Sequence, residues 1–208
     1  MQHKLPLSGV ILAGGQNSRV NGQKKTFFTV GGDSIFDRIY SVMNNIFEDL
    51  MLVTRTPECF LQWDINIVPD IFDIHCPLNG IYSGLFFAST PHIFVIACDI
   101  PFISFDLINY ICSSYDTSYD VYMPKTIKGE EPLCAIYSKQ CLNRFKTCLQ
   151  QERYKITRCL NGFKTGFIDD TTLPLKDKQF HSFFNVNTSE DLAYANILVE
   201  KLNEGELK

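Results

Sequence analysis

The stretch Ser8-Gly9-Val10-Ile11-Leu12-Ala13-Gly14-Gly15, near the N-terminus, decides the fold. Its run up to Ala13 is short and mostly apolar, and two glycines close it, so it predicts a buried strand that ends in a loop. The segment Ser34 to Asp49 then repeats apolar residues at helical spacing and opens with Ser34 three positions before Asp37. That pair is a capping box, so the segment predicts a helix.

The same alternation continues along the chain. Strand patterns cover Leu50–Thr54, Ile65–Val68 and His92–Cys98, and helical patterns cover Ile81–Ser89 and Phe105–Ser113. Strands that alternate with helices favour a mostly parallel sheet covered by helices on both faces. Ligands of such sheets bind beyond the carboxyl ends of the strands, so the loops after the strands are the candidate sites.

The second half of the chain is less regular. Val121–Met123 and Leu133–Tyr137 read as strands on either side of an exposed loop, Pro124–Pro132, which is typical of an inserted hairpin. The remaining expectations are short helices at Leu142–Leu149 and Ile156–Leu160, strands at Phe167–Ile168 and Phe183–Val186, a polar connector at Leu173–Lys178, and a last helix that Thr188 and Asp191 cap. No repeat or linker divides residues 1–208, so a single domain is expected.

Composition places the chain among ordinary globular proteins, with 208 residues, 45% hydrophobic and 20% charged. Its 19 Lys+Arg against 23 Asp+Glu give a formal charge of −4, which argues against nucleic acid as a partner. No apolar run approaches the roughly 20 residues that span a bilayer. The N-terminus lacks the pattern of a secretory signal, so a cytoplasmic location is expected.

The cysteines predict no metal or redox motif. There are eight, and no two form a C-x-x-C pair. Most lie in apolar runs, as Cys98 does, where a thiol behaves as a small buried hydrophobe. We therefore expect reduced, mainly buried thiols.

The loop after the first strand combines Gly14 and Gly15 with the cations Arg19, Lys24 and Lys25. Glycines allow main-chain N–H groups to approach phosphate oxygens, and the cations offset phosphate charge. The spacing matches neither the Walker A loop nor the dinucleotide fingerprint. A glycine turn beside an exposed basic face is the alternative interpretation.

The strand Phe94 to Cys98 delivers Asp99 to its carboxyl end, and Pro101 follows at once. A carboxylate at that place can bind Mg²⁺, although an Asp after a strand often only caps a turn. Because loops after neighbouring parallel strands converge, a metal on Asp99 would face phosphates held at Gly14 and Gly15.

Five segments together resemble the MobA-type molybdenum cofactor guanylyltransferases. They are Leu12-Ala13-Gly14-Gly15 with Arg19 and Lys25, Cys76-Pro77-Leu78-Asn79-Gly80-Ile81, Cys98-Asp99-Ile100-Pro101-Phe102, Glu131-Pro132-Leu133 to Tyr137, and Asn185-Val186-Asn187-Thr188. The resemblance runs from about Ser8 to about Leu192 and keeps the family's segment order. It implies a Rossmann-like three-layer nucleotidyltransferase fold. It also implies an enzyme that uses Mg²⁺ to transfer GMP from GTP to molybdopterin, or to its molybdenum-loaded form, with release of pyrophosphate.

The resemblance also implies residue roles. The nucleotide would be cradled by Gly80 and by the backbone of Leu12, Ala13, Gly14 and Gly15, and its phosphates would be contacted by Lys25 beside Arg19. Asp70 would recognise guanine, and Asp99 would bind the metal. Molybdopterin would be faced by Asn185 and Asn187. Lys24 is the alternative to Lys25. Proteins that supply the cofactor or accept it as molybdoenzymes would be possible partners.

Elementary chemistry is compatible with two of these roles. A carboxylate at Asp70 can accept from the two adjacent N–H groups of guanine, although a turn-stabilising Asp is the alternative. Asn185 and Asn187 would share one face of an extended strand, although one of them can simply organise the turn into the last helix. His75, His92 and His181 lack a matching nucleophile or metal-ligand spacing.

The identity of the nucleotide base is the feature that the sequence determines least. The family usually carries glycine at Cys76 and a small residue at Asn79, and bulkier side chains there would tilt guanine. Cytidylyl transfer to molybdopterin, or another small-molecule nucleotidyl transfer, is therefore the alternative. A nucleotide-binding module without turnover is a further one.

Overall fold

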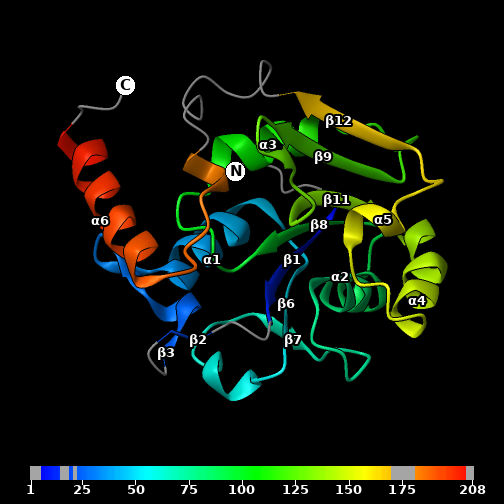
Figure 1. The fold of residues 1–208 in the computed structure, drawn as a ribbon, viewed down its shortest axis with the longest axis horizontal. Helices are drawn as coiled ribbons and strands as arrows, with labels where there is room; N and C mark the ends of the chain where they lie inside the picture. The colour runs from blue at the N-terminus through cyan, green and yellow to red at the C-terminus, as the bar shows by residue number, and fades with distance from the viewer. Residues whose placement is uncertain (1–5, 15–18, 21–22, 170–180, 205–208) are drawn as a thin grey trace.

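The computed structural model describes residues 6–14, 19–20, 23–169 and 181–204 (Figure 1). The helices are α1 Ile35–Ile46, α2 Pro77–Phe87, α3 Phe105–Ser113, α4 Leu142–Gln150, α5 Ile156–Cys159 and α6 Ser189–Glu204. The strands are β1 Ser8–Ala13, β2 Arg19–Val20, β3 Gln23–Lys24, β4 Thr29–Val30, β5 Asp33–Ser34, β6 Leu50–Thr54, β7 Asn66–Val68, β8 His92–Ala97, β9 Val121–Thr126, β10 Gly129–Glu130, β11 Cys134–Ser138 and β12 Thr165–Asp169. Short 3₁₀ helices cover Lys25–Phe27, Pro57–Cys59, Lys139–Cys141 and His181–Phe183.

One eight-stranded sheet organises the molecule, in the order β10-β9-β11-β8-β1-β6-β7 with β12 beside β9. The strand β1 lies at its centre and pairs in parallel with β6 and β8, so that Leu12 stands opposite Val53 and Ala97. The strand β11 is antiparallel to both β8 and β9, and β10 is antiparallel to β9. The predicted strand at Ser8 to Ala13 and the mostly parallel sheet are confirmed.

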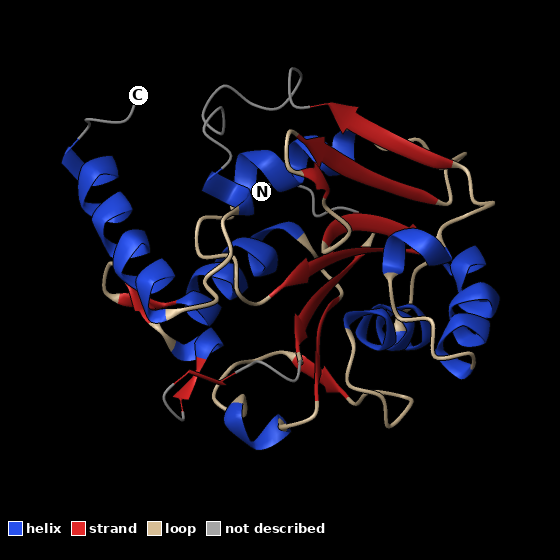
Figure 2. Cartoon of the chain, viewed as in Figure 1, coloured by secondary structure: helices blue, strands red, loops and turns tan. Residues whose placement is uncertain are grey.

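Helices cover both faces of this sheet, which confirms the three-layer α/β fold (Figures 1 and 2). On one face, α1, α3 and α6 bury apolar side chains against Ile11, Leu52 and Phe94. On the other face, α2, α4 and α5 pack against Val10, Met51 and Val95. Neighbouring residues of β1 thus point into different apolar clusters, which is why its sequence is apolar without alternation.

Both predicted N-cap residues accept the expected main-chain hydrogen bond, and the reciprocal bond of a full capping box is present at Thr188. The Ser34 hydroxyl accepts from the main-chain N–H of Asp37 at 3.0 Å and opens α1. Thr188 accepts from Asp191 N at 3.1 Å, and the Asp191 carboxylate accepts in return from Thr188 N at 2.8 Å. These reciprocal bonds satisfy N–H groups that the first helical turn leaves without partners.

Three predictions along the chain are wrong in detail. Helix α2 begins at Pro77, ahead of the predicted Ile81, because proline is well suited to the first turn of a helix. Pro124–Pro132 is not simply an exposed loop, since β9 continues to Thr126 and pairs there with β10 across a turn at residues 127–128. Gly129, the first residue of β10, has a φ of 126°. Among the described residues no strand forms over Phe183–Val186, where the chain instead leaves the 3₁₀ helix His181–Phe183. The predicted connector Leu173–Lys178 lies outside the described residues.

The cysteines match their prediction. No disulfide joins any of the eight, and Cys112, Cys134, Cys141, Cys148 and Cys159 are buried. Among the described residues, no helix is both long enough and apolar enough to cross a membrane.

Candidate active site

The strand order creates a crevice at the carboxyl edge of the sheet. The chain leaves β1 towards β6 and β7 on one side and later returns to β8 on the other side. In sheets of this kind, the point where the strand order reverses is the usual ligand site. A pocket of about 130 Å³ lies there, lined by Leu12, Gly14, Val53, Arg55, Asp70, His75, Cys76, Pro77, Gly80, Ala97, Cys98, Asp99 and Leu133.

Gly14 and Asp70 face each other across this pocket. A Cβ atom added to Gly14 would lie 4.0 Å from Asp70 Oδ2. On the pocket wall, a Cβ atom added to Gly80 would lie 3.1 Å from Leu12 Cδ2, so α2 packs closely on β1. The structure therefore brings the predicted residues Leu12, Gly14, Gly80 and Asp70 together. Ala13 ends β1 beside them, and its carbonyl accepts from the Thr54 hydroxyl at 3.1 Å.

Asp70 is more than half buried in the pocket wall. Burial raises the pKa of its carboxyl to about 6, although the nearby Arg55 and His75 act in the opposite direction. Arg55 is in turn ion-paired with the exposed Asp73. This wall therefore offers the carboxylate of Asp70 as a hydrogen-bond acceptor, with Arg55 and His75 near it as donors. Such a set suits a nucleotide base that has both donor and acceptor groups.

Asp99 also lines the pocket, two residues after the end of β8. Burial raises the pKa of its carboxyl, and its own main-chain N–H and Lys25 offset this only in part. Its buried Oδ1 atom makes no hydrogen bond with any residue that the structure describes. A buried carboxylate oxygen without a partner is costly unless a cation binds it, so Asp99 fits a metal ligand.

The described residues contain no group of three or more His, Cys, Asp or Glu side chains arranged to hold a metal ion. A metal that used Asp99 could take further ligands from water and from a substrate. Mg²⁺ is typically bound in this way, by one or two carboxylates together with substrate phosphates.

Lys25 is buried at the start of the 3₁₀ helix Lys25–Phe27, with 8% of its surface exposed. Its Nζ atom donates a 3.2 Å hydrogen bond to Asn187 Oδ1. Its charge also lowers the pKa of Asp191, for which the larger cause is the hydrogen bond from the Asn187 main chain. The ammonium group therefore lies between the metal candidate and the segment that opens α6.

The segment Asn185 to Asn187 is anchored beside Asp99. The N–H of the buried Val186 donates to the Asp99 carbonyl at 2.9 Å, and the side chains on either side of it, Asn185 and Asn187, are exposed. The two asparagines thus alternate with a buried residue although no strand forms. The predicted proximity to the nucleotide crevice rests on this main-chain hydrogen bond.

Gly15 lies outside the described residues, and the structure does not describe the side chains of two other predicted residues, Arg19 and Lys24. Arg19 and Lys24 pair through their main chains in the two-stranded ribbon of β2 and β3. Their roles, and the choice between Lys24 and Lys25, stay predictions, although Lys25 is the one with a described contact to Asn187.

Sequence reasoning missed Arg55 and His75 as pocket residues and misjudged Asn79. Arg55 directly follows β6, a position that topology alone marks as a candidate. Asn79 does not line the pocket. Its side chain is fully buried and bonds to the loop that follows Asp70, so it does not occupy the space of a base.

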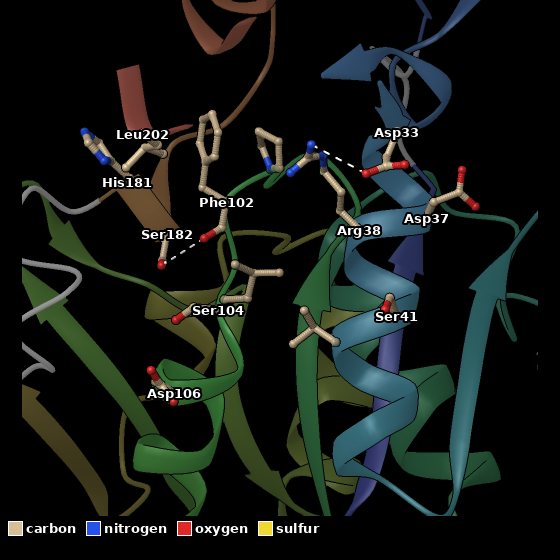
Figure 3. A pocket seen from close by; sticks show the side chains of 13 residues that line it. Asp33, Asp37, Arg38, Ser41, Phe102, Ser104, Asp106, His181, Ser182 and Leu202 are labelled. Carbon is tan, nitrogen blue, oxygen red and sulfur yellow. Dashed lines mark hydrogen bonds and ion pairs between the residues drawn. The ribbon is translucent and has the colours of Figure 1, made fainter. Parts of the chain in front are cut away.

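A larger cavity of about 560 Å³ lies elsewhere, between α1, the loop before α3 and α6 (Figure 3). Three carboxylates, Asp33, Asp37 and Asp106, line it against one arginine, Arg38. Asp37 is committed to the Trp63 indole and to the cap of α1, and Arg38 is ion-paired with Asp33. Its acidic lining makes this cavity unsuitable for a triphosphate.

Comparison with known proteins assigns the chain to a family. A family model described as the MobA-like NTP transferase domain matches residues 9–162. A molybdenum cofactor guanylyltransferase of Desulfosudis oleivorans is 34% identical over 93% of this chain and 96% of its own length. A probable molybdenum cofactor guanylyltransferase of Natranaerobius thermophilus is 35% identical over 91% and 94%. The crystal structure of molybdopterin-guanine dinucleotide biosynthesis protein A from Archaeoglobus fulgidus superposes with a TM-score of 0.81 at 22% identity, covering 94% of this chain and all of that one.

With the family model and the curated relatives, this three-layer α/β fold is that of a nucleotidyltransferase. Within that class, the chain belongs to the MobA-like NTP transferase family. The family suggests a requirement for a divalent metal, and the Oδ1 atom of Asp99, which has no hydrogen-bond partner among the described residues, fits such a metal.

Proposed function

We propose that this protein transfers GMP from GTP to molybdopterin, or to its molybdenum-loaded form, and releases pyrophosphate. The observation that carries the proposal is the convergence of Gly14, Asp70 and Asp99 on one pocket, with Lys25 beside Asp99. The names of the relatives, molybdenum cofactor guanylyltransferases, support this choice of substrates.

Each side chain has a role that its position supports. Ionised Asp70 accepts from N1–H and the 2-amino group of guanine, a pair of donors that cytosine and adenine do not present on one edge. Lys25 offsets the charge of the triphosphate, and Arg19 is proposed to assist it. Asn185 and Asn187 hold the acceptor, because they are the exposed residues of the segment anchored to Asp99.

The reaction needs alignment more than a general base. A terminal phosphate oxygen of the acceptor attacks the α-phosphorus of GTP, a new P–O bond forms, and the bond to pyrophosphate breaks. That oxygen is already ionised at neutral pH, so no histidine has to remove a proton. Mg²⁺ held by Asp99 would supply charge stabilisation on the phosphate oxygens when bound. The protein holds the two substrates in line, which by itself removes a large part of the barrier.

The direct test is a pyrophosphate-release assay with molybdopterin, Mg²⁺ and either GTP, CTP or ATP. Release with GTP, with at least about tenfold lower kcat/KM for the other nucleotides, is expected from the loss of hydrogen bonds to Asp70. Release with CTP in preference to GTP would contradict the base assignment. GTP binding without any release would instead favour a nucleotide-binding module.

A further inference from the structure

The segment that follows Asp70 is held from inside the protein by α2. Asn79 and Ser83 lie four residues apart on that helix, so they share one face, and both are fully buried. Buried polar side chains in a helix are uncommon and need hydrogen-bond partners. Both find those partners in the residues directly after Asp70.

The Asn79 amide uses its hydrogen-bonding groups on this segment. Its Nδ2 atom donates to the carbonyls of Phe72 at 2.7 Å and Ile74 at 2.9 Å. Its Oδ1 atom accepts from Phe72 N at 3.3 Å. Both amide protons are thus committed to the main chain of one short loop.

Ser83 fixes the loop one residue closer to Asp70. Its hydroxyl accepts from Ile71 N at 2.9 Å and donates to the Asn79 carbonyl at 2.8 Å. The two side chains therefore form one continuous hydrogen-bonded unit with the loop. On the outer side of the same loop, the exposed Asp73 is ion-paired with the pocket residue Arg55.

We infer that Asn79, with Ser83, is the positioning residue for base recognition, because it fixes the loop that sets the place of Asp70 and His75 in the pocket wall. This rests on the proposed function, in which Asp70 reads guanine. The loop begins at Asp70 and leads to His75, and both line the pocket that Gly14 faces. Neither Asn79 nor Ser83 lines that pocket, so they act on the base through the loop.

The consequence is specific to one part of the nucleotide. Inosine triphosphate, ITP, lacks only the 2-amino group of guanine, so preference for GTP over ITP reports the hydrogen bond from that group to Asp70. A hydrogen bond to a charged group makes that preference about tenfold to a hundredfold in the wild type. Releasing the loop lets Asp70 move, and the preference falls while the triphosphate contacts at Lys25 and Asp99 persist.

The experiment measures the dissociation constants of GTP and ITP with Mg²⁺, and the kcat/KM of each, for the wild type, Asn79→Ala and Ser83→Ala. We expect the GTP:ITP preference to fall to within about threefold of unity in Asn79→Ala and to fall partly in Ser83→Ala, with ITP affinity nearly unchanged. All measurements are made well below each variant's thermal midpoint, and Ser83→Ala removes only one oxygen, so the test does not depend on one variant folding.

Asn196→Ala is the matched control. Asn196 also holds a turn from a helix, accepting from Gly31 N at 3.0 Å and donating to the Thr29 carbonyl at 3.3 Å, but on the β4–β5 turn. Its loss is expected to leave the preference at the wild-type value. An unchanged preference in Asn79→Ala and Ser83→Ala overturns the inference, as does an equal fall in Asn196→Ala.

The same measurements distinguish a failure of the proposed reaction from a failure of the positioning role of Asn79. If the wild type prefers GTP in binding and Asn79→Ala does not, but no pyrophosphate is released with molybdopterin, the reaction is wrong and the positioning role stands. If the wild type itself binds GTP and ITP equally, Asp70 does not read the 2-amino group and both proposals are overturned.

Discussion

The Nζ atom of Lys25 donates a 3.2 Å hydrogen bond to the side-chain oxygen of Asn187, across 162 positions of sequence. The proposed triphosphate residue and the proposed acceptor residue are therefore in direct contact before either substrate is bound. Because Lys25 is buried, few alternative places are open to its ammonium group. The contact links the two proposed substrate sites physically.

We expect this contact to make the two residues act as a unit. Lys25→Met should lower kcat/KM by about 10²–10³, the usual effect of removing a donor that stabilises developing charge. Asn187→Ala should raise KM for the acceptor by about tenfold. In a double-mutant cycle, the combined loss should fall short of the sum by about 1 kcal/mol, measured as kcat/KM for pyrophosphate release. Strict additivity would mean that the contact is incidental.

Asp99→Asn should separate activity from stability. Burial raises the pKa of Asp99, so ionising this carboxyl in the folded protein costs stability as pH rises through the raised pKa, and an amide removes that cost. At pH 8 without metal, the variant should melt at the same temperature as the wild type or higher. Turnover should fall by about 10²-fold or more, and the extra stabilisation by Mg²⁺ with GTP should be lost.

Asp116→Asn is the control for that measurement. Asp116 is an exposed turn residue whose Oδ1 accepts from Ser118 N at 2.8 Å, and an asparagine oxygen can accept the same bond. Its activity and its response to Mg²⁺ should match the wild type. An Asp99→Asn enzyme with full activity would exclude Asp99 as the metal ligand.

GTP affinity should depend on pH through Asp70. Burial raises the pKa of its carboxyl to about 6, and only the ionised form accepts from both guanine donors. Below pH 6, the dissociation constant of GTP should rise by up to about tenfold per pH unit as the site protonates. Asp70→Asn should bind GTP more weakly at pH 8 and lose this part of the pH dependence. Titration of the triphosphate itself affects both proteins, so the difference between them isolates Asp70.

The raised pKa of Asp70 also affects how the stability of the folded protein changes with pH. The folded protein holds its Asp70 proton to a higher pH than the unfolded chain, so without ligand this group's contribution to stability is present at acid pH and is lost as pH rises from about 4 to 6. Thermal midpoints of the wild type should therefore decline over that window relative to Asp70→Asn. A parallel course for the two proteins would show that Asp70 titrates normally.

A stabilising substitution is expected at Glu152, remote from the crevice. Its φ of 57° is left-handed, at the position after α4 where Arg153 N donates to the Cys148 carbonyl at 2.9 Å. Glycine has no Cβ, so it relieves roughly 1–2 kcal/mol of steric cost in the folded state. It also gives the unfolded chain more conformational freedom, which lowers stability by about 0.4–1 kcal/mol. Glu152→Gly should therefore raise the free energy of unfolding by about 0.5–1 kcal/mol in urea titrations. Gln151→Gly, at a residue with φ of −94°, should not stabilise.

The sequence alone predicted the features that depend on neighbouring residues. The apolar run that became β1, the caps at Ser34 and Thr188, and the alternation that builds a parallel sheet are all local patterns. Topology rules then placed Asp99 and Gly14 at one crevice, because carboxyl ends of adjacent parallel strands must meet. The fold class and the family resemblance were available at that level.

Only the tertiary structure decided how distant side chains meet. No periodicity reveals that Lys25 reaches Asn187, that Arg55 and His75 join the pocket, or that Asn79 stays out of the pocket and holds the loop after Asp70. The absence of a strand at Phe183–Val186 has the same origin, since Val186 bonds to the carbonyl of Asp99, and not to a neighbouring strand. Such contacts depend on the order of strands and the paths of loops, which summed local preferences do not specify.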